Sequence, residues 1–161
     1  MSTAVSGAFV LTTNMLDLWF KYNNGVYLTF SPAAYETITA HLKSRNMTVN
    51  DFDLIVTGDL GFIGSDILLD LFRRDGIDIS RVHNDCGKMI YDRDKQDVHA
   101  GGSGCGCSGS VLCGYIMDKV RKGELKNVLF AATGALMSTT VVQQGESIPG
   151  ISHAVHISSE V

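Results

Sequence analysis

The chain lacks the long apolar runs and the basic segments that would connect it directly to a membrane or to nucleic acid. None of its apolar stretches approaches the ~20 residues that a membrane-spanning helix needs. Its first residues lack the basic region of a secretory signal. The formal net charge is −4, and no basic stripe with interleaved aromatic residues is present. We therefore expect no transmembrane segment and no nucleic-acid partner.

Cysteine is scarce and unevenly placed. Of the four cysteines, Cys105, Cys107 and Cys113 fall within nine positions. This clustering differs from the dispersed cysteines of a secreted disulfide scaffold, so reduced thiols in a bacterial-type cytoplasm fit better. A zinc site could combine Cys105 and Cys107 with Cys86, Cys113 or His99, but one C-x-C pair without a second pair is a weak signal. We therefore expect no metal and no cofactor.

Common catalytic and nucleotide-binding signatures are also missing from the sequence. It has no H-E-x-x-H helix, no recognisable Ser–His–Asp arrangement and no paired acid and base carboxylates. Its glycine-rich segment lacks the Lys-Ser/Thr ending of a phosphate-binding P-loop. The local chemistry favours binding over catalysis.

What is present suits one folded α/β domain over residues 1–161. The chain is 45% hydrophobic and 19% charged, which is ordinary for a globular protein. Helices are predicted from an N-cap and proline at Ser31-Pro32 to about Arg45, from about Ser65 to Arg74, and through the apolar pattern that begins at Val111. The predicted strands are 8–11, 54–56, 127–133 and 154–158, with 88–92 as a short strand or a loop. This alternation predicts a mixed, mostly parallel sheet of about five strands flanked by helices.

Two predicted strands run into glycine turns, at Gly58 and Gly134. In sheets of this kind, ligands bind beyond the carboxyl ends of the strands. We therefore expect these two turns and the glycine-rich segment 101–107 to converge on one crevice.

The glycine-rich segment is the main candidate site. Four glycines in residues 101–108 leave the backbone bare just before a predicted helix, whose N-terminal N–H groups favour an anion. A thiol at such a helix start is also expected to have a lowered pKa. The alternative is that the glycines only let the helix pack tightly against the sheet. The candidate ligand-binding residues are Gly101, Gly102, Ser103, Gly104, Cys105, Gly106 and Cys107, with Asp59 and His99 beside them.

Three segments together resemble one known family. They are residues 53–61 (DLIVTGDLG), residues 100–108 (AGGSGCGCS), and residues 132–137 (ATGALM) followed by 143–155 (QQGESIPGISHAV). They are similar to the second half of the stage V sporulation protein AD family of endospore-forming bacteria, from about Ser31 to the end of the chain. Asp85-Cys86-Gly87 fits the same pattern. The resemblance implies a thiolase-like fold, built from two similar halves, of which this chain holds the second.

The resemblance implies that the protein binds dipicolinic acid and supports its uptake into the forespore, together with stage V sporulation membrane proteins. It implies a location in the cytoplasm or forespore, with peripheral association to the spore inner membrane through those partners. Pairing with a missing first half, or self-association, is a further expectation. Dipicolinate is a flat aromatic dianion, so it needs hydrogen-bond donors for two carboxylates and a slot for the ring. Asp59 would repel it unless protonated, bridged by a metal or turned away.

The related condensing enzymes carry catalytic residues that this sequence does not match. Where ketoacyl synthases have a histidine just after a strand, this chain has Thr57-Gly58-Asp59. Their later Asn- or His-containing loop corresponds to residues 101–104, and the late Cys-x-Gly turn of thiolases to residues 132–134. We therefore expect a non-catalytic protein. The alternatives are an acyltransferase that uses Cys105 or Cys107 as a new nucleophile, and a purely structural subunit that docks a membrane channel complex.

Overall fold

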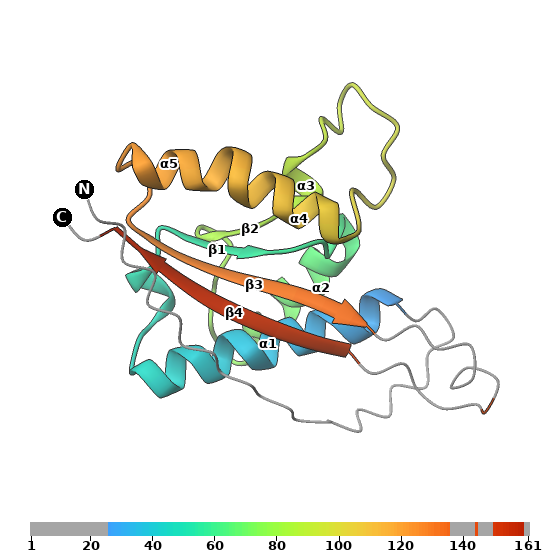
Figure 1. Cartoon of the computed structure of the whole chain (residues 1–161). Coiled ribbons are helices and arrows are strands. Elements are labelled where there is room, and N and C mark those ends of the chain that lie inside the picture. Colours follow the sequence, from blue (N-terminus) through green and yellow to red (C-terminus); the bar gives the residue numbers. More distant parts are fainter. Residues whose placement is uncertain (1–25, 136–143, 145–149, 160–161) are drawn as a thin grey trace.

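In the computed structural model, residues 26–135, 144 and 150–159 are described, and they form a sheet covered by helices on both faces (Figure 1). The strands are β1 (Leu54–Thr57), β2 (His83–Asp85), β3 (Asn127–Ala135) and β4 (Gly150–Ser158), in the spatial order β2-β1-β3-β4. Strand β1 is parallel to both β2 and β3, whereas β4 is antiparallel to β3. The predicted α/β class and mixed, mostly parallel sheet are confirmed. The strand predicted at residues 8–11 lies outside the described residues.

Helices cover the two faces of this sheet in separate layers. Helices α1 (Val26–Arg45) and α2 (Gly61–Arg74) pack on one face. The other face carries one continuous helix made of α4 (Cys105–Val111), a π-helical stretch (Leu112–Ile116) and α5 (Met117–Arg121). The short segments η1 (Val49–Asp51) and α3 (Cys86–Met89) complete the described helices. Figure 1 shows α4 and α5 on the opposite side of the strands from α1.

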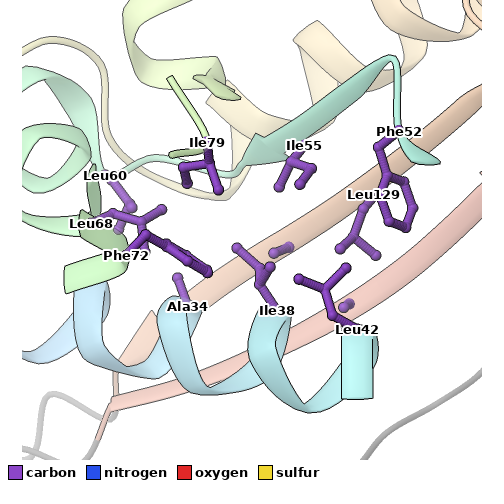
Figure 2. Close-up of a cluster of buried hydrophobic side chains, with 12 residues drawn as sticks. Ala34, Ile38, Leu42, Phe52, Ile55, Leu60, Leu68, Phe72, Ile79 and Leu129 are labelled. Atoms are coloured by element: carbon purple, nitrogen blue, oxygen red, sulfur yellow. The ribbon is translucent and has the colours of Figure 1, made fainter. Parts of the chain in front are cut away.

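Alternate residues of the central strands point to opposite layers, and both layers are buried. Ile55 and Leu129 face α1 and α2, whereas Val56 and Val128 face the helix that starts at Cys105. Figure 2 shows the first cluster, in which Ile38 of α1 and Phe72 of α2 lie against this face of the sheet. Burying a side chain of this size stabilises the fold by about 1.5–3 kcal/mol. Because both faces are covered, strands β1 and β3 appear in the sequence as continuous apolar runs.

The predicted starts of the first two helices are wrong. Helix α1 begins at Val26 and runs through Pro32, so Ser31-Pro32 is not its N-terminus. The Ser31 hydroxyl instead donates to the carbonyl of Gly64 in α2, at 2.8 Å. Helix α2 begins at Gly61 rather than Ser65, and Ser65 is fully buried inside it. In both cases the serine hydroxyl is used in a contact with another element, and not to cap its own helix.

The segment between α2 and the glycine-rich loop, predicted to be a short strand or a loop at 88–92, matches only the second alternative, and only in part. The strand there is β2, residues 83–85, residues 86–89 form α3, and residues 90–92 belong to neither a helix nor a strand. Asp85 caps α3 because its Oδ1 accepts a hydrogen bond from the Gly87 amide at 2.8 Å. Strands β3 and β4 match the predicted positions and are longer than predicted.

Candidate ligand-binding loop at the carboxyl ends of the strands

The loop between α3 and α4, yellow-green in Figure 1, projects from the body and returns across the start of α2. The Ala100 carbonyl accepts a hydrogen bond from the Phe62 amide at 2.7 Å. Gly61 has a φ of +65°, and a Cβ atom there would lie 2.1 Å from the Ala100 oxygen. This close approach is therefore possible only for glycine.

The first glycines of the candidate loop are packed against the protein. The Gly101 amide donates to the Val98 carbonyl and the Gly102 amide to the Gly87 carbonyl, each at 2.7 Å. A Cβ atom on Gly102 would lie 2.9 Å from a methyl group of Ile90. Gly101 and Gly102 therefore pack tightly with their amides engaged within the protein, but against α2 and the α3 region and not between the helix and the sheet.

Asp85 lies beneath the loop as a fully buried carboxylate. Its oxygens accept from the amides of Leu60, Gly61 and Gly87 at 2.8–2.9 Å and from the Thr57 hydroxyl at 2.5 Å. Burial raises the pKa of Asp85, and these four hydrogen bonds act in the opposite direction. One carboxylate thus joins the end of β1, the start of α2 and the start of α3.

Asp59 joins the loop to the carboxyl ends of β1 and β3. Its Oδ2 accepts from the Gly104 amide at 2.7 Å and from the Ser103 hydroxyl at 3.4 Å. Its Oδ1 accepts from the Thr133 hydroxyl at 3.3 Å. At Gly58, a Cβ atom would lie 3.4 Å from both the Ala132 Cα and the Ser108 Cβ. As predicted, the ends of the two strands and the glycine-rich segment lie close together, here through Asp59, but the predicted turn at Gly134 is wrong, because Gly134 lies within β3.

The last part of the candidate segment is helical. Helix α4 begins at Cys105, earlier than the start predicted from the apolar pattern at Val111. The Cys107 amide donates to the Gly104 carbonyl at 3.0 Å, as expected in a first turn. The amides of Ser103, Cys105 and Gly106 have no acceptor among the residues that the structure describes. Nothing lies within 4 Å of a Cβ position on Gly104 or Gly106. This end of the segment is open, and it carries the positive end of the dipole of the helix 105–121.

The cysteines differ sharply in environment. Cys86 and Cys107 are buried, whereas Cys105 and Cys113 are exposed. Burial, with the nearby charge of Asp85, raises the pKa of Cys86 to about 12 and also raises that of Cys107. The expectation of a lowered thiol pKa at this helix start is therefore wrong for Cys107. Within the described residues, no three His, Cys, Asp or Glu side chains are grouped so as to hold a metal ion.

His99 does not join Asp59. Its side chain is 87% exposed, and its Nε2 lies 3.3 Å from Asp97 Oδ1. Beside this pair is an open hollow of about 180 Å³, lined by Tyr91, Asp97, Val98 and Gly101. The hollow therefore lies next to the first glycine of the loop.

Sequence reasoning missed a group of basic and aromatic side chains near Gly101. The Arg93 guanidinium carbon lies 4.4 Å from the centre of the Phe62 ring, and the Lys88 ammonium lies 5.9 Å from the same centre. A Cβ atom on Gly101 would lie 3.3 Å from the Phe62 ring. No sequence signal joins these residues, because Phe62 is far from both cations along the chain.

The family model described as Stage V sporulation protein AD matches residues 9–158. The Stage V sporulation protein AD of Bacillus subtilis (strain 168) is 49% identical over 125 residues.

The chain belongs to the stage V sporulation protein AD family. The aligned region covers 78% of this chain and 37% of the Bacillus subtilis relative. This chain thus corresponds to a part of that relative. Residues from all three segments that carried the family resemblance meet at Asp59 through its contacts with Gly104 and Thr133. Among the described helices, none has the length and apolar character needed to cross a bilayer.

Proposed function

We propose that this chain is part of a non-catalytic protein that binds dipicolinic acid and supports its uptake into the forespore. The ligand-binding part is the open end of the glycine-rich segment, where the amides of Ser103, Cys105 and Gly106 have no acceptor among the described residues and Gly104 leaves room beside them. Membership of the stage V sporulation protein AD family supports the sporulation role. The observation that carries the ligand assignment is the group of unengaged amides at the start of the helix 105–121.

The geometry of these amides suits a carboxylate. N–H groups at a helix start that have no acceptor point away from the helix, and the helix dipole favours negative charge there. The absence of neighbours around Gly104 and Gly106 leaves room for a ligand to approach the backbone. Gly101, Gly102, Gly104 and Cys107 then have a supporting role, because their amides already donate within the protein.

Asp59 acts in this proposal by holding the loop in place. Both of its oxygens accept hydrogen bonds from protein groups, so the carboxylate is directed toward Gly104 and Thr133. Its negative charge nevertheless opposes a dianion at the neighbouring amides. Asp59 therefore limits the affinity of the site while it orders it.

We propose that the protein has no condensing activity. Cys107 is buried and the pKa of its thiol is raised, which is unfavourable for a nucleophile. The proposed protein partners of this chain are stage V sporulation membrane proteins and the remaining part of the family's longer chain. Its proposed location is the cytoplasm or forespore, at the spore inner membrane through those partners.

The proposal is tested by calorimetric titration of dipicolinate into this chain and into the Bacillus subtilis relative. Gly106→Asp should weaken binding in either protein at the matching position, because it places a carboxylate beside the open amides. Gly114→Asp is the matched control, since Gly114 also has nothing within 4 Å of its Cβ position and lies about 12 Å further along the helix. A relative that does not bind dipicolinate, or equal effects of the two substitutions, would contradict the proposal.

A further inference from the structure

We propose that Lys88 and Arg93 form a second anion-binding point, beside Gly101, for one carboxylate of a small aromatic dianion. This inference rests on the proposed function, since it supplies the second anchor that a dicarboxylate requires. Its starting observation is that two cationic side chains lie close to the same aromatic ring, that of Phe62.

Neither cation is neutralised within the described part of the chain. Some other surface cations have carboxylate partners: Lys95 lies 2.8 Å from Asp92, and Lys122 lies 2.6 Å from Asp118. None of the ion pairs among the described residues includes Lys88 or Arg93. Two positive charges close to one ring, without a counter-ion, are complementary in charge to an added carboxylate.

Arg93 is held by stacking and not by an ion pair. Its guanidinium carbon lies 4.4 Å from the centre of the Phe62 ring, which is the range of a cation–π contact. This contact uses the face of the planar guanidinium and leaves its N–H groups at the edge. A guanidinium edge is the part that binds a carboxylate with two parallel hydrogen bonds.

Lys88 is held from the interior by a hydrogen-bond chain with a fixed direction. His83 Nδ1 lies 3.2 Å from the Ile55 carbonyl, which can only accept, so Nδ1 carries the proton. Burial lowers the pKa of His83 to about 4, so its Nε2 is an acceptor at neutral pH. The Ser65 hydroxyl, 2.9 Å away, must therefore donate to Nε2.

It follows that the Ser65 oxygen is free to accept from Lys88, whose Nζ lies 3.3 Å from it. An ammonium group has three donors, and the hydrogen bond to Ser65 uses only one of them. The Lys88 side chain is thus fixed by a buried neighbour while donors remain for a ligand. Because its position is set before binding, less side-chain entropy is lost when the ligand arrives.

Phe62 links this pair of cations to the glycine-rich segment. A Cβ atom on Gly101 would lie 3.3 Å from the Phe62 ring, and Gly101 also lines the hollow of about 180 Å³. Tyr91, exposed at 42%, lines the same hollow and offers an aromatic surface to a flat ring. Asp97 is the one acidic residue among the residues lining that hollow, and it lies 3.3 Å from His99.

The test compares Lys88→Met and Arg93→Met with Lys95→Met in the full chain. Each change removes one positive charge, but Lys95 is already paired with Asp92. Calorimetric titrations use pyridine-2,6-dicarboxylate (dipicolinate) and benzene-1,3-dicarboxylate, and thermal unfolding checks that each variant is folded. We expect each of the first two changes to weaken dipicolinate binding about tenfold and to reduce its salt dependence. Lys95→Met should change the affinity less than about twofold. Lys88→Arg should keep most of the binding, because it keeps the charge.

The outcomes separate this inference from the proposed function. If dipicolinate binds and all three methionine variants bind it equally well, the inference is wrong and the proposed function stands. If dipicolinate does not bind, but the benzene dicarboxylate binds through Lys88 and Arg93, the proposed function is wrong and the site stands. If the wild-type chain binds neither dianion, the site is overturned.

Discussion

Asp85 and Asp59 are two carboxylates at the same end of the sheet, and they have different structural roles. Asp85 is fully buried and accepts four hydrogen bonds, three of them from backbone amides. Asp59 is only partly buried and accepts from one amide and two hydroxyl groups, two of these contacts at 3.3–3.4 Å. The inner carboxylate holds three elements together, whereas the outer one positions a loop.

Because of this difference, we expect Asp85 to contribute mainly to stability and Asp59 mainly to binding. A buried carboxylate with short contacts to fixed amides cannot be removed without leaving those amides unsatisfied. A carboxylate at the rim can be replaced by water or by a ligand at a small cost. We therefore expect substitutions at the inner side to change stability and substitutions at the rim to change binding.

The largest expected effect is that of Asp85→Ala. It would leave the buried amides of Leu60, Gly61 and Gly87 without an acceptor, and each such group costs about 1–3 kcal/mol. We expect the free energy of unfolding to fall by about 3–5 kcal/mol in urea titrations. A loss below about 1 kcal/mol would show that water or a rearranged loop replaces the carboxylate.

The contribution of Asp85 to the free energy of unfolding should change with pH in one direction. Burial raises the pKa of Asp85 above its ordinary value of 3.8, so the folded protein holds this proton more tightly than the unfolded chain. The contribution of Asp85 to stability is then full below pH 3.8 and declines as the pH rises through the folded-state pKa. The difference in unfolding free energy between the wild type and Asp85→Ala should therefore be larger at low pH than at neutral pH.

The close approach at Gly61 offers a second way to disturb the inner side. Gly61→Ala would place a methyl group 2.1 Å from the Ala100 oxygen, at a φ of +65°. Gly76→Ala is a matched control, because Gly76 has a φ of +74° and nothing within 4 Å of its Cβ position. We expect a loss of about 1 kcal/mol for Gly76→Ala and of about 3 kcal/mol or more for Gly61→Ala, measured by urea unfolding. Equal losses would mean that the loop moves away from α2 at little cost.

The parts of the fold that were predictable from the sequence are those whose stability comes from apolar burial. Strands β1 and β3 appear as apolar runs because both of their faces are covered. The approach of the strand ends and the glycine-rich segment to one another was predictable for a related reason. Once the strands are parallel, their carboxyl ends must lie at one edge.

The parts that were not predictable depend on contacts between residues far apart in the sequence. Strand β2, His83–Asp85, has no apolar pattern, and its side chains bond to Ile55, Thr57 and the amides of α2. The early start of α4 also contradicts local propensity, since glycine disfavours helix. There, burial of Cys107 and Val111 against the sheet outweighs that preference.

The smallest expected change in stability, and the most informative for binding, is that of Asp59→Ala. It frees the Gly104 amide and removes a negative charge beside the proposed site. We expect a loss of about 1 kcal/mol in unfolding free energy, together with dipicolinate binding that is several-fold tighter by calorimetry. Asp53→Ala is the matched control, because Asp53 also accepts from backbone amides, those of Lys126 and Asn127, at the opposite ends of the same two strands. If the two substitutions change dipicolinate affinity equally, the charge of Asp59 does not act on the ligand, and the open amides beside it are not where the ligand binds.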